Sequence, residues 1–120
     1  PYASIIPAIG NNDVTPDYYL DLEDPMEILT MVARGLDTLM ESEEERTTFL
    51  NGGFLARNVS DSLTVLSLNT LVYSTSHIPA NSDDDGQMND PLTQFAWLEN
   101  QLDLAATNFR TVYIMGHIPP

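Results

Sequence analysis

Apolar and polar positions along the first third of the chain predict a strand, a polar turn and a helix. Residues 4–9 form a short apolar run that ends in Gly-Asn-Asn-Asp at 10–13, as expected of a buried strand entering a tight loop. Asp24 and Pro25 then predict a helix start, with the acid as N-cap and proline at the first helical position. Apolar residues recur at helical spacing and predict one apolar face: Leu29, Val32, Ala33, Leu36, Leu39 and Met40.

The middle of the chain predicts a short helix followed by a hairpin. Ser42 with Glu45 three residues later has the pattern of a capping box, and the helix should end near residues 51–53. Residues 54–59 and 63–70 are rich in β-formers and are separated by a short polar turn. Such a pair of segments is typical of two antiparallel strands.

The last third predicts a polar loop, a second long helix and a final strand. The loop covers residues 74–89, and we expect it to be mobile. Its acids at 83–85 lack the longer alternating pattern and closing Glu of an EF-hand, so we expect them to be solvated rather than calcium ligands. Asp90 and Pro91 predict the helix start. The apolar side of this helix is expected to hold Phe95, Leu98, Leu102 and Ala105 or Ala106, with Trp97 near it.

Residues 111–115 predict a buried strand, and Gly116 and His117 follow at its carboxyl end. The order of strand, helices, hairpin, helix and strand indicates an α/β fold. The 120 residues suit one domain or a large part of one. Because the chain starts at a proline and stops just after a strand, we expect both ends to be cuts within a longer protein.

Composition narrows the class of function. Four basic residues, all Arg, stand against 18 acidic ones and give a net charge of −14. Nonspecific nucleic-acid binding is disfavoured, because it depends on Lys and Arg that neutralise phosphates. No apolar run has the length of a membrane span. The chain has no Cys, so it offers no disulfide and no thiolate ligand. Asn58-Val59-Ser60 is a glycosylation sequon that would matter in a secretory lumen.

Two places combine a strand end, a glycine and side chains that bind metals. Asn11, Asn12 and Asp13 follow Gly10, and His117 follows Gly116. Ligands of α/β sheets collect at the carboxyl ends of strands, and a mixture of Asn, Asp and His donors suits zinc, manganese or iron. Each signal alone is also typical of an ordinary turn or a structural histidine. His77 lies in a polar stretch without such a strand and glycine, and we interpret it as structural.

Taken together, these motifs resemble the calcineurin-like metallophosphoesterases, in the branch of acid sphingomyelinase and endopolyphosphatase. Gly-Asn-Asn-Asp at 10–13 resembles their Gly-Asn-His-Asp/Glu block. Gly-Gly-Phe at 52–54, leading to Leu-Ser-Leu-Asn-Thr at 66–70, is similar to the next segment of that branch. Gln-Phe-Ala-Trp-Leu-Glu at 94–99 and the run through Gly-His-Ile-Pro-Pro at 116–120 are similar as well, so the resemblance spans nearly the whole chain in the right order.

The resemblance implies a fold and a set of roles. The fold would be a four-layer sandwich of paired sheets flanked by helices, with residues 1–120 as the central portion of one domain. Asn11 and His117 would each ligate a metal, and Asp13 would support the loop through hydrogen bonds behind the ligands. The family holds two divalent ions that polarise a phosphate and activate a water. Its Asp-x-His, Gly-Asp and Gly-His-x-His blocks are absent here, so we expect this chain alone to be inactive.

One position departs from the family pattern. Asn12 stands where the family usually has a His that contacts the phosphate and helps to protonate the leaving group. An amide donates a hydrogen bond but delivers no proton, which favours anhydride substrates such as polyphosphate, as in endopolyphosphatases. A sphingomyelinase-like phosphodiesterase and a noncatalytic binding protein that keeps the fold remain as alternatives. The resemblance also favours a lysosomal or vacuolar lumen or secretion.

Overall fold

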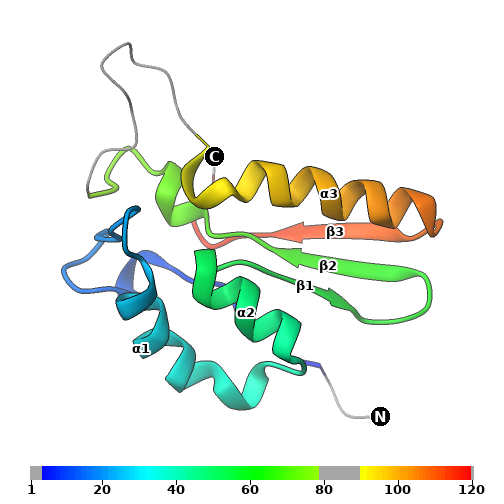
Figure 1. The fold of residues 1–120 in the computed structure, drawn as a ribbon, viewed down its shortest axis with the longest axis horizontal. Coiled ribbons are helices and arrows are strands. Elements are labelled where there is room, and N and C mark those ends of the chain that lie inside the picture. The colour runs from blue at the N-terminus through cyan, green and yellow to red at the C-terminus, as the bar shows by residue number, and fades with distance from the viewer. Residues whose placement is uncertain (1–3, 79–89, 120) are drawn as a thin grey trace.

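A three-stranded mixed sheet organises the protein, which Figure 1 shows as a computed structural model describing residues 4–78 and 90–119. The strands are β1 (Leu55–Asn58), β2 (Leu63–Ser67) and β3 (Thr111–Met115), in the order β1-β2-β3. β1 and β2 are antiparallel, which confirms the predicted hairpin, and β2 and β3 are parallel. A parallel pair needs a long crossover, and the chain supplies one that includes a helix. The predicted α/β class is therefore confirmed.

The helices border the sheet on two sides. α3 (Gln94–Thr107) contacts β3, α2 (Glu43–Gly52) contacts β1, and α1 (Met26–Leu36) packs against α2 (Figure 1). Short 3₁₀ turns are η1 (Asn11–Asp13), η2 (Asp37–Leu39), η3 (Thr70–Tyr73) and η4 (Pro91–Thr93). The main core lies where α1, α2, the sheet and the N-terminal segment meet, and its buried members are Ile9, Val14, Leu20, Leu29, Met40, Phe49, Leu55, Leu71 and Val72. None of the helices in the described ranges has the length and apolar content of a membrane span.

The start of α1 differs from the prediction. Pro25 is the N-cap, and no side chain caps the helix there, so the assignment of Asp24 as N-cap is wrong. The preceding turn is instead held by Asp21, whose Oδ1 accepts hydrogen bonds from the amides of Glu23 at 2.9 Å and Asp24 at 3.3 Å. The apolar face is confirmed: Leu29 is fully buried, Met40 is buried beyond η2, and Val32, Ala33 and Leu36 pack against the core.

α2 begins at the predicted cap. Ser42 Oγ accepts a hydrogen bond from the Glu45 amide at 3.1 Å. The other half of the predicted capping box is not made, because Glu45 Oε2 accepts from the Glu41 amide at 2.8 Å instead. The helix ends at Gly53, which has φ of 75° and donates its amide to Phe49 O at 2.7 Å. Glycine adopts this left-handed conformation at little cost, which explains the end near residues 51–53.

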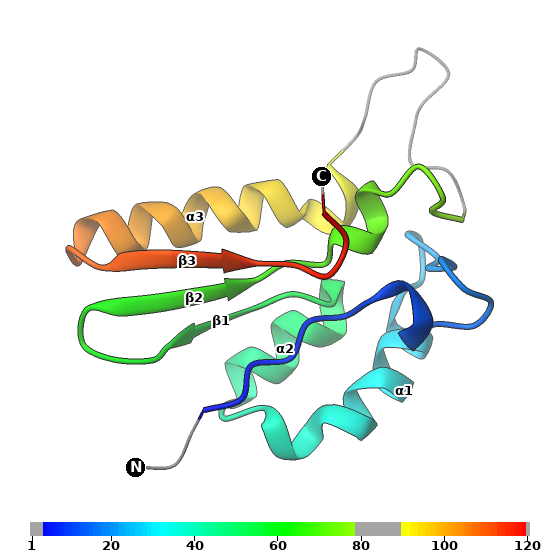
Figure 2. The ribbon, with the colours of Figure 1, turned by 180° about the vertical axis from the view of Figure 1, so that it is seen from behind.

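The predicted strand at residues 4–9 is wrong. The segment runs past α2 without pairing to any of the three strands (Figure 2). Proline at position 7 has no amide hydrogen to donate to a ladder. Side chains, and not a neighbouring strand, donate hydrogen bonds to the carbonyls of residues 4–9. Ser67 Oγ donates to Pro7 O at 2.7 Å, and Arg57 Nη1 donates to Ile5 O at 2.9 Å. Its apolar pattern reflects burial of residues such as Ile9 rather than strand pairing.

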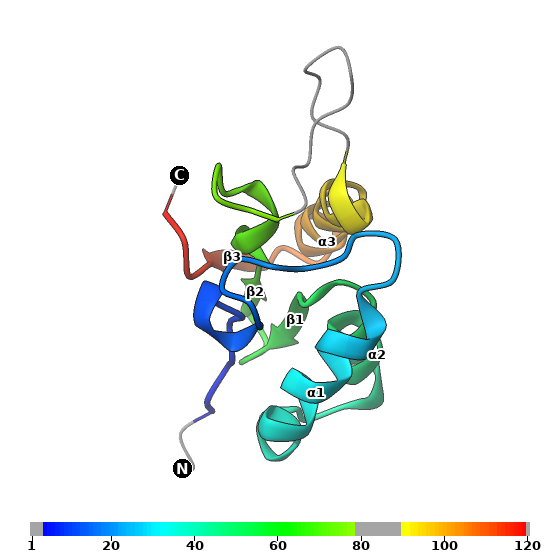
Figure 3. The ribbon, with the colours of Figure 1, turned by 90° about the vertical axis from the view of Figure 1, so that its left-hand side faces the viewer.

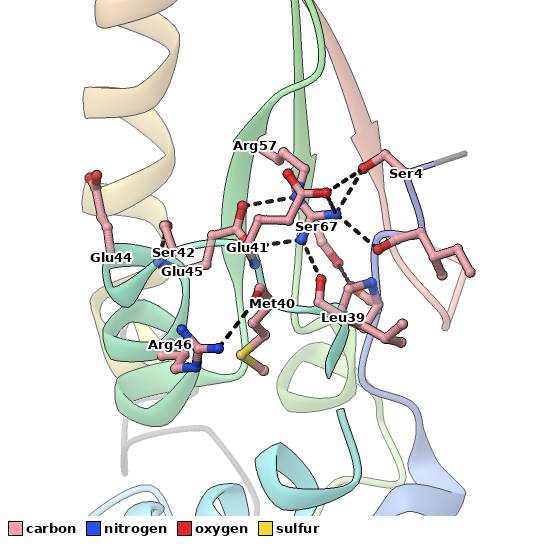
Figure 4. A network of polar contacts seen from close by, with 12 residues as sticks. Ser4, Leu39, Met40, Glu41, Ser42, Glu44, Glu45, Arg46, Arg57 and Ser67 are labelled. Atoms are coloured by element: carbon pink, nitrogen blue, oxygen red, sulfur yellow. Dashed lines mark hydrogen bonds and ion pairs between the residues drawn. The ribbon is translucent and has the colours of Figure 1, made fainter. Parts of the chain in front are cut away.

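Arg57 ties this segment to α2 and to the end of η2 (Figure 4). Its side chain is only 3% exposed. Nε donates to Glu45 Oε1 at 2.9 Å, and Nη2 donates to Glu45 Oε2 and Leu39 O, each at 2.7 Å. Nη1 donates to Ser4 Oγ at 3.0 Å and to Ile5 O. These five bonds match the five N–H donors of a guanidinium, so the buried charge is fully satisfied.

The Arg57 network favours the ionised form of Glu45. Burial raises the pKa of this carboxyl, but hydrogen bonds from Arg57 and from the Glu41 amide outweigh burial, so the pKa of Glu45 lies below its usual value. The hydrogen bond to Glu45 raises the pKa of Arg57 in turn. No local sequence pattern predicts this network.

α3 starts through the predicted acid, but three residues later than expected. Asp90 accepts hydrogen bonds from the amides of Phe95 at 2.8 Å and Ala96 at 3.0 Å. Pro91–Thr93 form the separate turn η4, in which Leu92 has φ of 57°. The acid therefore caps the first amides of α3 across this turn.

Two predictions of burial are wrong in this part of the chain. β3 forms as predicted, yet Tyr113 is 63% and Ile114 53% exposed, because β3 lies at the edge of the sheet and, among the described residues, pairs with β2 alone. On α3, Phe95 is 54% and Leu102 40% exposed, whereas Leu98 is half-buried and Ala105 is buried. Trp97 packs at a tilt against Phe54, with a centroid distance of 4.6 Å. The predicted loop acids at 83–85 lie outside the described residues.

Candidate functional site

The two segments singled out for metal chemistry meet in space. η1 lies beside the segment that follows β3 (Figure 3). Asn11 Oδ1 is 3.1 Å from His117 Nε2, although the two residues are 106 positions apart in the chain. A Cβ atom at Gly10 would lie 2.7 Å from His117 Cδ2, so the imidazole occupies space that only glycine leaves free.

Asp13 closes the turn that carries Asn11. Its Oδ2 accepts a hydrogen bond from the Gly10 amide at 2.7 Å, and its own amide donates to Gly10 O at 3.2 Å. The carboxylate bond is the one half of a capping box that a glycine N-cap permits, and the other bond is a backbone bond of the turn. Val14, the next residue, is buried in the core and anchors the turn from below. The Asp13 carboxylate is thus occupied with the backbone of the turn.

Thr70 holds the His117 segment from the other side. Its Oγ1 accepts a hydrogen bond from the Ile118 amide at 2.8 Å. A Cβ atom at Gly116 would lie 2.5 Å from Thr70 Cγ2, so a glycine before His117 lets the chain pass close to η3. Thr70 was predicted only as the end of a strand, and no local signal in the sequence indicates its contact with residue 118.

The amide group of Asn11 is oriented by two neighbours. Its Nδ2 donates to Asp17 Oδ1 at 3.0 Å and to Asn12 Oδ1 at 3.1 Å. The Oδ1 atom therefore faces His117. Asn12 itself is exposed at the surface of the turn. Sequence reasoning did not single out Asp17, and its place six residues after Asn11 carries no recognisable motif.

The two atoms Asn11 Oδ1 and His117 Nε2 lie at a distance that two ligands of one metal ion can have. Ligand atoms each about 2.0–2.2 Å from one ion and at right angles to each other are roughly 3 Å apart. Asn11 Oδ1 and His117 Nε2 are 3.1 Å apart and form a hydrogen bond here, a distance that is also compatible with that spacing. One amide oxygen and one imidazole nitrogen suit zinc, manganese or iron. Within residues 4–78 and 90–119, no three His, Asp or Glu side chains gather at a metal-binding distance. The pair alone would supply only part of a ligand set.

Comparison with known proteins identifies the family. No family model matches the chain. Over 120 residues it is 38% identical to sphingomyelinase phosphodiesterase D of Dictyostelium discoideum, covering 100% of this chain and 26% of that protein. It is 34% identical over 125 residues to a cyclic GMP-AMP phosphodiesterase of Bos taurus, covering 99% and 25%. It is 30% identical over 121 residues to an endopolyphosphatase of Schizosaccharomyces pombe, covering 100% and 21%.

The chain belongs to the sphingomyelinase and endopolyphosphatase branch of the calcineurin-like phosphoesterases. The resemblance drawn from the motifs is thereby confirmed. The chain spans about a quarter of the length of these relatives.

A pocket lies beside the segment that carries His117. It has a volume of about 350 Å³, and Ile118, the residue after His117, lines it. Burial raises the pKa of Tyr73 in its wall to about 12, and the Tyr73 hydroxyl accepts a hydrogen bond from Gln94 Nε2 at 3.0 Å. The phenol therefore stays protonated at physiological pH. The lining residues are Thr70, Tyr73, Ser74, Thr75, Ile118 and Pro119.

His77 has the environment of a structural histidine, as interpreted from the sequence. It is 5% exposed, and its Nε2 donates to Leu20 O at 3.0 Å. Its Nδ1 is buried without a partner among the described residues. Burial lowers the pKa of His77, which favours the neutral ring.

Proposed function

We propose that the full-length protein is a metal-dependent hydrolase of phosphoanhydride or phosphoester bonds. In this proposal, residues 1–120 form the central portion of one catalytic domain, a four-layer sandwich of paired sheets and helices. The observation that carries it is the meeting of Asn11 Oδ1 and His117 Nε2 at 3.1 Å. The names of the relatives support hydrolysis of phosphodiester or polyphosphate bonds as the chemical class.

Asn11 and His117 would ligate one of two divalent ions, with zinc, manganese or iron as candidates. The remaining ligands would come from other parts of the protein. When bound, such ions supply the charge that polarises a phosphoryl group and the acidity that turns water into a nucleophile. Asp13 accepts a hydrogen bond from the Gly10 amide and so closes the turn, which would hold Asn11 in a fixed position. These ions would also offset the repulsion between a polyanionic substrate and a chain of net charge −14.

Asn12 favours an anhydride substrate. Its amide would donate a hydrogen bond to a phosphate oxygen, but it has no proton to give to a leaving group. General-acid help is typically a factor of about 10²–10⁴, and the need for it falls when the leaving group is a weak base. Phosphate leaving from a phosphoanhydride is a far weaker base than an alkoxide leaving from a phosphodiester. An endopolyphosphatase activity is therefore the preferred form of the proposal.

A phosphodiesterase activity is the second candidate, and the pocket beside His117 favours it. Tyr73, Ile118 and Pro119 give this pocket an apolar wall that polyphosphate would not use. An organic group attached to the phosphate would gain affinity from it. Two of the relatives carry names of phosphodiesterases with such substrates.

The test uses the full-length protein and measures bound metal by elemental analysis together with product release from polyphosphate and from sphingomyelin. We expect two metals per chain and faster hydrolysis of polyphosphate than of sphingomyelin, with the hydrolysis lost in the Asn11→Ala variant. A clear preference for sphingomyelin would move the proposal to the second candidate. A protein that stays metal-free and inactive after supply of manganese, zinc and iron would be a noncatalytic binding protein with this fold.

We also propose that the protein works in a lysosomal or vacuolar lumen or outside the cell. The sequon at 58–60 supports this location, and Asn58 at the end of β1 is exposed. Treatment of the natural protein with an N-glycosidase should reduce its mass, and an Asn58→Gln variant should lack that change. An unglycosylated natural protein would remove this support.

A further inference from the structure

We infer that Asp17 is a positioning residue that sets the direction of the Asn11 amide for metal binding. This inference rests on the proposed function and deepens it. Asp17 Oδ1 accepts a hydrogen bond from Asn11 Nδ2 at 3.0 Å. It comes from the loop beyond η1 and contacts the nitrogen of the amide, whereas His117 contacts the oxygen.

The chemistry of the two ends of an amide makes the direction matter. The oxygen of Asn has lone pairs for a metal, whereas its NH₂ group donates hydrogens and offers no ligand. A carboxylate accepts hydrogen bonds and donates none when ionised. With Asp17 in place, the NH₂ end of Asn11 must face Asp17, and Oδ1 must face His117. Asp17 thereby selects the one amide orientation that presents a ligand atom.

The same carboxylate acts on Asn12 through Asn11. The second hydrogen of Asn11 Nδ2 goes to Asn12 Oδ1 at 3.1 Å, so the oxygen end of the Asn12 amide is also fixed. Among the described residues, Asn12 Nδ2 has no hydrogen-bond partner, which leaves it to donate to a phosphate oxygen. One acidic side chain therefore orients both a metal ligand and a phosphate donor.

The backbone of the loop brings Asp17 back over η1. The amide of Tyr18, the next residue, donates to Asn11 O at 3.3 Å and closes the loop on η1. Farther along, Leu20 is fully buried, and its amide donates to Ile78 O at 2.9 Å. Val14, before the loop, is buried in the same core. Because both sides of the loop are anchored, ordering Asp17 against Asn11 costs little additional entropy.

The test is a titration of the metal-free full-length protein with Mn²⁺, followed by electron paramagnetic resonance, in wild type and in Asp17→Ala and Asp17→Asn variants. Loss of a group that orients a ligand typically weakens metal binding roughly 10–100-fold, and we expect that loss in Asp17→Ala. Asp17→Asn should bind with intermediate affinity, since an amide oxygen still accepts the hydrogen bond but also permits the reversed arrangement. The spectrum of bound Mn²⁺ should change in the same order.

Glu23→Ala is the matched control, because Glu23 is an exposed acid of the same segment that does not contact Asn11. It should bind Mn²⁺ as wild type does, which separates orientation from a loss of negative charge. Wild-type affinity in Asp17→Ala, combined with loss of binding in Asn11→Ala, would overturn the role of Asp17 and leave the proposed function intact. Wild-type Mn²⁺ affinity in Asn11→Ala would overturn the proposed site itself.

Discussion

The network around Arg57 and the Asn11–His117 pair use polar side chains in opposite ways. Arg57 is buried, and its five N–H donors all have acceptors within the chain. His117 is exposed, and the ring contacts the partly buried Asn11 through a single nitrogen. A fully satisfied buried charge has nothing left to offer a ligand, whereas the exposed His117 ring and the oxygen of Asn11 are accessible to one. The difference separates a group that holds the fold from a group that is available for chemistry.

Removing Arg57 should have the largest effect on stability. Loss of one partner of a buried ion pair typically costs about 3–5 kcal/mol, because the other charge stays buried and unpaired. Arg57→Ala would strand Glu45 and release the segment at residues 4–9 from α2. We expect a loss of that size in urea unfolding. Arg34→Ala, at an exposed position of helix α1, is the control and should stay within about 0.5 kcal/mol of wild type. Equal free energies of unfolding for the two variants would show that the Arg57 network does not stabilise the fold more than an exposed Arg does.

Removing His117 from the full-length protein should have little effect on stability and a large effect on activity. Because the ring is exposed, His117→Ala should change the unfolding free energy of the metal-free protein by less than about 0.5 kcal/mol. Metal-dependent phosphate release should fall more than about 100-fold, since losing a ligand should exceed the roughly 10–100-fold cost of losing a ligand's support. Urea unfolding and phosphate release on one preparation test both statements. A large loss of stability with activity retained would assign His117 to the scaffold.

Local patterns were enough to predict part of this fold. The Ser42 cap, the hairpin and the apolar face of α1 depend on spacings within a few residues, and all three are present. The motifs also selected Asn11 and His117, which the fold brings together across 106 positions.

What the sequence could not predict depends on contacts between distant segments. Arg57 reads locally as one polar residue in a strand, and its role depends on acceptors from residues 4–5, Leu39 and Glu45. The burial expected for β3 failed for a similar reason. The apolar pattern of β3 shows which side chains the strand could bury. Whether neighbouring elements cover those side chains depends on the place of β3 in the sheet, which the pattern does not give.

Replacing Glu45 in the Arg57 network should lower stability less than replacing Arg57, and should also change how stability depends on pH. The pKa of Glu45 is lowered in the folded protein, so its contribution to stability is present above the unfolded value of 4.5 and is lost as pH falls through the lower folded value. Glu45→Gln removes the titrating group. We expect it to cost about 1.5–3 kcal/mol at neutral pH, the range for a hydrogen bond to a charged group, and to flatten the decline of stability below pH 4.5. Urea unfolding at stepped pH measures this slope, and an unchanged slope would show that Glu45 does not couple to folding.

The smallest predicted effects come from adding one methyl group to either of two glycines. Gly10 has φ of −123°, which alanine adopts without strain, so the methyl of Gly10→Ala would act only by contact with the His117 ring. We expect the ring to shift and Mn²⁺ affinity to fall roughly tenfold, the low end of the cost of disturbing a ligand's support. Gly35 lies inside α1 with open space around its missing Cβ. Gly35→Ala should therefore stabilise the protein by about 0.5–1 kcal/mol and leave Mn²⁺ binding unchanged. The two variants make the same chemical change in the two kinds of region, so the comparison fails if Gly10→Ala alters stability alone or if Gly35→Ala alters metal binding.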